Sequence, residues 1–113
     1  MKHKDLVIFE KIIKYANKVI DYSYNFSLEN FQNDMKTVEA CIFNISLIGE
    51  EVGNLDKDII NKYTHIKWKA IKDLRNKIVH DYDSVIVDSI WEIITDDIPQ
   101  LIIDLHMIIE NEK

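Results

Sequence analysis

Residues that favour tight turns are almost absent from this chain, and their scarcity restricts the fold more than any other feature. The 113 residues include only two glycines and one proline. A β-sandwich or β-barrel needs many tight turns, so both architectures are disfavoured. The composition, 47% hydrophobic and 30% charged, is that of a folded protein, and the length suits one domain over residues 1–113.

Apolar residues recur at spacings of three and four in the first half of the chain, which is typical of amphipathic helices. The first helix is expected to run from Leu6 to about residues 22–25. Ser27 or Asn30 caps the second helix, which ends near Gly53. This second helix has a seam like that of a coiled coil, suited to packing in a bundle or against a second subunit. The seam comprises Phe31, Met35, Val38, Ile42, Ile45, Gly49 and Val52.

The second half of the chain also has helical periodicity. A short helix is expected over residues 56–63, and a longer one starts at 64–67 and stops at 80–83. Asp83 or Ser84 caps the next helix, and the last begins just before Pro99, unless these two form one helix kinked at that proline. The sequence therefore predicts an all-α, antiparallel bundle of four or five helices.

Charge and cysteine content narrow the range of functions. The net charge of −6 argues against a broad basic surface for nucleic acid, and Arg75 is the single arginine among 14 basic residues. Cys41 has no second cysteine to pair with, and no export signal or membrane span is apparent, so we expect a cytoplasmic protein. Acidic pairs fall where helix caps are expected, and no metal-binding or phosphate-binding motif occurs. We therefore expect neither a metal ion nor another cofactor.

The most specific pattern lies late in the third long helix. Arg75 is followed directly by Asn76, then by His80 and Tyr82. This Arg-Asn-x-x-x-His-x-Tyr pattern resembles the HEPN superfamily, and most closely its HepT-like branch. That branch consists of small helical ribonuclease toxins encoded beside a minimal nucleotidyltransferase antitoxin.

Other segments of the chain extend the same resemblance. Leu47-Ile48-Gly49-Glu50 resembles the Ile-Gly-Glu signature of that branch. Trp68 before the arginine, and Trp91 followed by Ile98-Pro99-x-Leu101 after the histidine, match its usual pattern. The resemblance therefore covers nearly the whole chain in order, and it implies a HEPN-like homodimer.

The resemblance implies RNA cleavage without a metal ion, leaving a 2′,3′-cyclic phosphate. A histidine titrates in the range needed for proton transfer, and an arginine offers a charged fork to phosphate oxygens. These roles fall to His80 and Arg75, while Asn76 orients the phosphate or the imidazole. Glu50 is a candidate supporting residue beside Arg75 or at the dimer contact. The ordinary alternative for Arg75 is a surface ion pair with Asp73 or Asp81.

Helical geometry separates the two principal candidates. Five residues at about 100° each leave the Cβ directions of Arg75 and His80 roughly 140° apart. Either the helix ends near His80 and redirects its side chain, or a second subunit completes the site. The resemblance favours a homodimer in which both motifs line one cleft.

Tyr82 has a separate implied role, as the acceptor of AMP added by the nucleotidyltransferase antitoxin. The modification would add negative charge close to Arg75 and so block RNA binding. The expected partners are therefore an RNA substrate, the antitoxin and a second copy of the chain. The alternative is a non-catalytic helical dimer that serves as the partner or substrate subunit of the nucleotidyltransferase.

Overall fold

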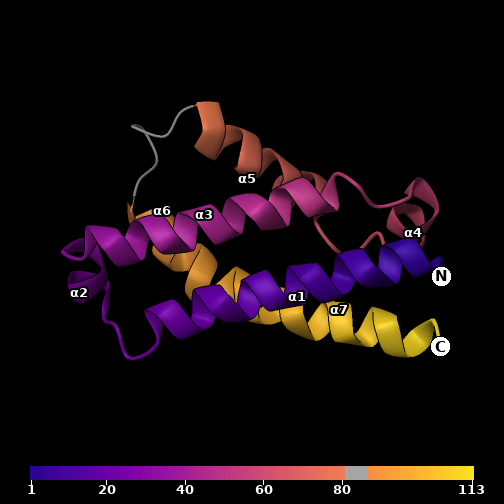
Figure 1. Ribbon diagram of the computed structural model, residues 1–113, viewed down its shortest axis with the longest axis horizontal. Coiled ribbons are helices and arrows are strands. Elements are labelled where there is room, and N and C mark those ends of the chain that lie inside the picture. Colours follow the sequence, from indigo (N-terminus) through magenta and orange to yellow (C-terminus); the bar gives the residue numbers. More distant parts are fainter. Residues whose placement is uncertain (81–86) are drawn as a thin grey trace.

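The structure is a computed structural model that describes residues 1–80 and 87–113, with only the backbone described for residues 79–80. Every regular element in these ranges is helical, which confirms the predicted all-α fold (Figure 1). The helices are α1 (His3–Ser23), α2 (Leu28–Gln32), α3 (Met35–Val52), α4 (Lys57–Lys62), α5 (Trp68–His80), α6 (Val87–Glu92), the π-helical turn η2 (Ile93–Asp97) and α7 (Ile98–Asn111). None of the described helices is long and apolar enough to cross a membrane.

The long helices lie side by side around one apolar core. α3 packs along α1 on one side and along α5 on the other, and α7 packs against α1 (Figure 1). In α1, the inward residues Phe9, Ile12, Ala16 and Val19 are fully buried, as their spacing of three and four predicts. The N- and C-terminal ends of the chain lie at the same end of the bundle, near α4 (Figure 1).

Both tryptophans contribute to packing between helices. Trp68 is buried at the start of α5, stacks near Phe9 with ring centroids 6.3 Å apart, and donates from Nε1 to the carbonyl of Tyr63 at 2.9 Å. Trp91 is half-buried against Phe31, with centroids 5.1 Å apart. The start of α5 is therefore fixed by a buried aromatic side chain whose polar atom has a partner.

The predicted second helix is in fact two helices, because a new cap interrupts it. The backbone N–H of Asn30 donates to Ser27 Oγ at 3.1 Å, so Ser27 caps only the short helix α2. Asp34 then accepts from the backbone N–H of Thr37 at 3.1 Å and starts α3. Met35 therefore opens α3 with 53% of its surface exposed, so this seam residue does not pack in the core of the single chain.

The chain is helical without a break from Val87 to Asn111, so no loop separates the helix before Pro99 from the last helix. The π-helical turn η2 directly precedes α7, in which Pro99 lies in the first turn. Proline has no backbone N–H, so Pro99 could not donate to the preceding turn even in a regular α-helix. The wider π-helical turn therefore costs no hydrogen bond at this residue. The predicted caps at Asp83 and Ser84 lie outside the described residues.

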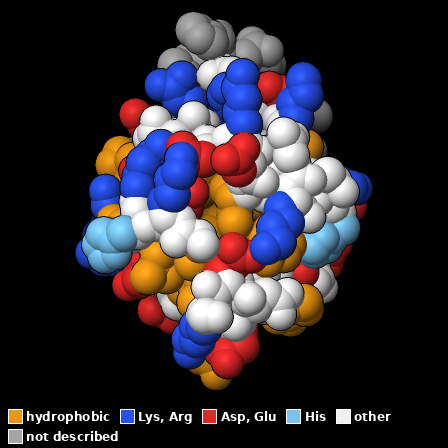
Figure 2. Space-filling view, turned by 90° about the vertical axis from the view of Figure 1, so that its right-hand side faces the viewer, with side chains coloured by type: hydrophobic (Ala, Val, Ile, Leu, Met, Phe, Trp, Pro, Cys, Tyr) orange, Lys and Arg blue, Asp and Glu red, His pale blue; other side chains and the backbone are white. Residues whose placement is uncertain are grey.

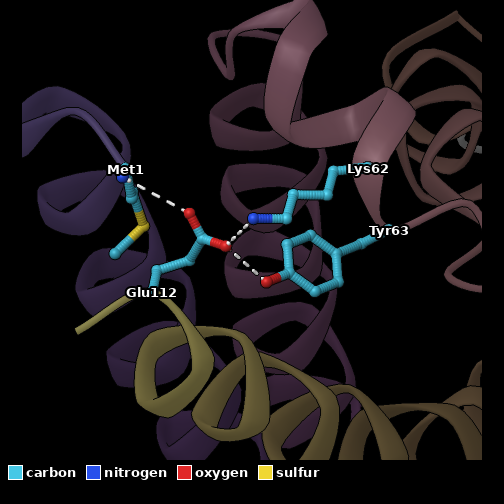
Figure 3. A network of polar contacts seen from close by, with 4 residues as sticks. All are labelled: Met1, Lys62, Tyr63 and Glu112. Atoms are coloured by element: carbon cyan, nitrogen blue, oxygen red, sulfur yellow. Dashed lines mark hydrogen bonds and ion pairs between the residues drawn. The ribbon is translucent and has the colours of Figure 1, made fainter.

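A polar network joins the end of α7 to the segment that precedes α5 (Figure 3). One carboxylate oxygen of Glu112 accepts from Lys62 Nζ and from the hydroxyl of Tyr63, both at 2.6 Å. Its other oxygen lies 3.3 Å from the α-amino nitrogen of Met1. The bond from Lys62 is the largest of the contributions that lower the pKa of Glu112 from 4.5 to about 2.

The lowered pKa makes the stability of the fold sensitive to acid. A carboxylate with a depressed pKa stabilises the folded state above its ordinary pKa, and that contribution is lost as the pH falls from 4.5 towards 2. Urea unfolding should therefore show Glu112→Gln to be less stable than the wild type at pH 7, with the difference shrinking at pH 3. Glu110→Gln, which removes a carboxylate whose side chain is 74% exposed, is the control. A deficit for Glu112→Gln that is equally large at pH 7 and at pH 2 would contradict the assignment.

Candidate active site

The candidate residues that the structure describes lie on α5 and on the part of α3 that it contacts. Arg75 is half-buried on α5, while Asn76 beside it is exposed. Ile78 is buried in the core and Ile71 packs against it, so these two side chains set the inward face of the helix. Arg75 lies between Ile71 and Ile78 at helical spacings of four and three, so its Cα is on the same face of α5. The Arg75 side chain therefore starts at the contact between α5 and α3.

Gly49 is the reason that α5 can lie so close to α3 near Arg75. A Cβ atom added to Gly49 would lie 2.5 Å from the Cβ of Arg75 and 2.9 Å from the carbonyl oxygen of Ile71. Both distances are shorter than real Cβ contacts, and neither atom can move away by a side-chain rotation. The glycine on the predicted seam is therefore explained by the backbone and first side-chain carbon of α5.

Among the described side chains, the guanidinium of Arg75 donates a hydrogen bond to its neighbour on α5. Its Nη1 donates to Oδ1 of Asn76 at 3.2 Å. Asp73, which was a candidate ion-pair partner, accepts instead from Lys69 Nζ at 2.8 Å. The other candidate, Asp81, lies outside the described residues. The position of Asn76 favours an orienting role toward Arg75, which the sequence did not predict.

The structure brings some predicted site residues together and leaves others outside its description. His80 lies at the end of the described part of α5, so it follows Arg75 on one continuous helix, about 7.5 Å further along the axis. Its side chain and the whole of Tyr82 are outside the described part of the chain. Glu50 is exposed on α3 next to Gly49, and its supporting role remains a prediction.

Positive charge is concentrated on α5 although the whole chain is acidic. Between residues 68 and 80 there are four Lys or Arg residues and one acidic residue, Asp73. Lys69, Lys72 and Lys77 are all exposed. In Figure 2 several Lys or Arg side chains gather near the top of the molecule, where Figure 1 places α5. A net charge of −6 therefore coexists with a locally basic helix.

A groove of about 520 Å³ runs beside α5 on the side facing α7. Its walls are mostly apolar and include Ile48 of α3, Leu74 of α5 and Leu101 of α7. Polar side chains line its edges, among them Lys67 and Asp104. Among the side chains that the structure describes, those of residues 1–78 and 87–113, no three from His, Cys, Asp or Glu lie close enough together to hold a metal ion.

The sequence matches the family model described as Ribonuclease HepT-like over residues 12–108. Among its relatives, "Putative RNase MJ0127" of Methanocaldococcus jannaschii is 34% identical over 112 residues, which span 98% of this chain and 93% of the relative. "Probable ribonuclease HepT" of Thermococcus cleftensis is 30% identical over 99 residues, 88% of each chain. No solved structure gives a significant match. The matched range contains Gly49, Arg75 and His80, and the chain belongs to the HepT-like ribonuclease family.

Proposed function

We propose that this protein is a metal-independent endoribonuclease in which His80 and Arg75 act on one phosphodiester. The 2′-hydroxyl of the RNA attacks the phosphorus, the bond to the 5′-oxygen breaks, and a 2′,3′-cyclic phosphate and a 5′-hydroxyl result. His80 takes the proton of the 2′-hydroxyl or supplies a proton to the leaving 5′-oxygen. Arg75 stabilises the added negative charge on the phosphate oxygens. The observation that carries the proposal is the position of Arg75 in this HepT-like chain. Its side chain starts at the contact between α3 and α5, and α5 also carries His80.

The basic surface of α5 supports RNA as the substrate. Lys69, Lys72 and Lys77 are exposed on the helix that carries Arg75, so the RNA backbone can approach it against little repulsion from the acidic remainder of the chain. Lys69 is partly neutralised by Asp73, which leaves Lys72 and Lys77 as the stronger phosphate contacts.

A homodimer would supply both an acid and a base to the cleft. On an ideal straight helix, positions five residues apart have Cβ directions about 140° apart, which favours a site that takes Arg75 and His80 from two chains. We expect Arg75→Ala and His80→Ala proteins to be inactive separately and to regain part of the activity when mixed subunits reassociate. The measurement is RNA cleavage by the mixture, with the dimer fraction followed by sedimentation. Full activity of isolated wild-type monomers would contradict a shared cleft.

Control of the toxin would depend on Tyr82 and a nucleotidyltransferase antitoxin. AMP attached to the Tyr82 hydroxyl would place a phosphate near Arg75 and compete with the RNA phosphate. Incubation with the neighbour-encoded transferase and ATP should add the mass of AMP to the wild type and to Tyr24→Phe, which alters a tyrosine that is 72% exposed. Tyr82→Phe should gain no mass, and an equal gain by Tyr82→Phe would exclude this acceptor.

The second candidate function is a non-catalytic subunit that binds the nucleotidyltransferase. The net charge of −6 favours it, because RNA-binding proteins usually carry excess positive charge. Expression in cells separates the two functions. A ribonuclease toxin arrests growth and loses that effect in His80→Ala, whereas a binding subunit leaves growth unchanged and still binds the transferase.

A further inference from the structure

Two residues near Arg75 bear directly on where its guanidinium lies. Gly49 faces the first side-chain carbon of Arg75 across the α3–α5 contact, and Asn76 accepts a hydrogen bond from its Nη1 at 3.2 Å. From these contacts we infer that Gly49 and Asn76 are positioning residues for Arg75 in RNA cleavage. The inference rests on the proposed function for its catalytic consequence, while the positioning itself can be tested without RNA.

The contact at Gly49 sets the distance between α5 and α3. An alanine Cβ at this position would meet the Cβ of Arg75 at 2.5 Å, whereas ordinary contacts begin at 3.4 Å. The backbone oxygen of Ile71 lies 2.9 Å from the same point, so rotation of the Arg75 side chain cannot relieve the overlap. The helix α5 must therefore retreat by about 1 Å, and it would carry Arg75 with it.

The hydrogen bond that Arg75 donates to Asn76 limits the direction of the guanidinium. Adjacent residues on a helix do not face each other, so Arg75 must bend its long side chain sideways to reach Oδ1 of Asn76. This bond uses one of the five N–H donors of the guanidinium, which has more donors than a single amide oxygen can accept from. Gly49 thus sets the origin of the side chain, and Asn76 sets its direction.

Arg75 offers a direct readout because it is the one arginine in the chain. Protein labelled with ¹⁵N-arginine should give a single side-chain Nε–Hε signal, which needs no further assignment. We expect Gly49→Ala and Asn76→Ala each to shift or broaden that signal, and each to lower kcat for RNA cleavage by about 10- to 100-fold with little change in KM. A misplacement of about 1 Å can have a kinetic effect of this size.

Gly53→Ala is the matched control for Gly49→Ala. It also adds a methyl group at the end of α3 near α5, but the nearest atoms are the Glu50 carbonyl at 3.2 Å and the flexible end of Lys72 at 3.5 Å. It should leave the Arg75 signal and kcat unchanged. If Gly53→Ala has the same effect as Gly49→Ala, or Gly49→Ala leaves the signal and kcat unchanged, the positioning role is wrong.

Two further outcomes have a defined meaning. If Gly49→Ala does not fold, Asn76→Ala tests the inference, because Asn76 is exposed and its truncation leaves the core intact. An unchanged Arg75 signal in that variant overturns the inference. If the wild type does not cleave RNA but the Arg75 signal responds to both variants as expected, the positioning inference stands and the proposed function fails.

Discussion

Replacing His80 with alanine should slow RNA cleavage by about 10²- to 10⁴-fold, which is the usual contribution of a positioned acid–base group. An alanine can neither take the proton of the 2′-hydroxyl nor supply one to the leaving 5′-oxygen. The loss should fall on kcat more than on KM, because proton transfer takes place in the transition state and not on binding. Single-turnover cleavage of a labelled RNA measures it directly.

His106→Ala is the control for this prediction. His106 is exposed on α7, so its removal deletes an imidazole without touching α5. The control protein should cleave RNA at the wild-type rate. An active His80→Ala protein would remove His80 from the mechanism and favour the function of a binding subunit.

Arg75→Lys should lower the cleavage rate by about 10- to 100-fold although it keeps the positive charge. A lysine presents a point charge, whereas the planar arginine fork can donate two hydrogen bonds to one phosphate. Loss of one hydrogen bond to a charged group corresponds to about 1.5–3 kcal/mol, and each 1.36 kcal/mol is a tenfold change in rate. The measurement is kcat/KM for RNA cleavage by the variant and the wild type at matched ionic strength.

Because Arg75→Lys keeps the positive charge, a lower cleavage rate in this variant cannot be caused by a loss of long-range electrostatic attraction. Lys77→Ala tests the opposite case, because it removes an exposed charge from the same helix and leaves the fork intact. It should weaken RNA binding and increase KM without a comparable fall in kcat. A fully active Arg75→Lys protein would assign Arg75 to an ordinary surface role.

Much of the fold could be predicted because an amphipathic helix produces a local periodicity of apolar residues in the sequence. Spacings of three and four predicted an amphipathic first helix, and the fully buried residues of α1, Phe9, Ile12, Ala16 and Val19, have those spacings. Cys41, which has no second cysteine to pair with, is buried in the core as free cysteines often are. Of the two predicted caps, Ser27 and Asn30, it is Ser27 that caps a helix, the short α2, because its side chain accepts from a backbone N–H only three residues away.

The failures occur where a local competitor or a distant partner decides the outcome. Asp34 competes as a cap within an apolar pattern that reads as continuous, and it divides the expected helix in two. The wide turn before Pro99 follows from a missing N–H, which the sequence shows, but periodicity does not distinguish it from a kink.

The candidate site depends more strongly on contacts that sequence spacing cannot give. Gly49 could be identified as a point of close approach, but its partner, Arg75, lies 26 positions away on another helix. The bond between Arg75 and Asn76 depends on a side-chain torsion, and residue order alone does not determine it.

The most direct test of the central claim is RNA cleavage by the purified protein in excess EDTA, with analysis of the product ends. Cleavage should continue in EDTA and leave a 2′,3′-cyclic phosphate on one product and a 5′-hydroxyl on the other, and His80→Ala should produce neither. Cleavage that requires an added divalent ion, or that leaves a 3′-hydroxyl and a 5′-phosphate, would contradict a metal-independent mechanism built on Arg75 and His80.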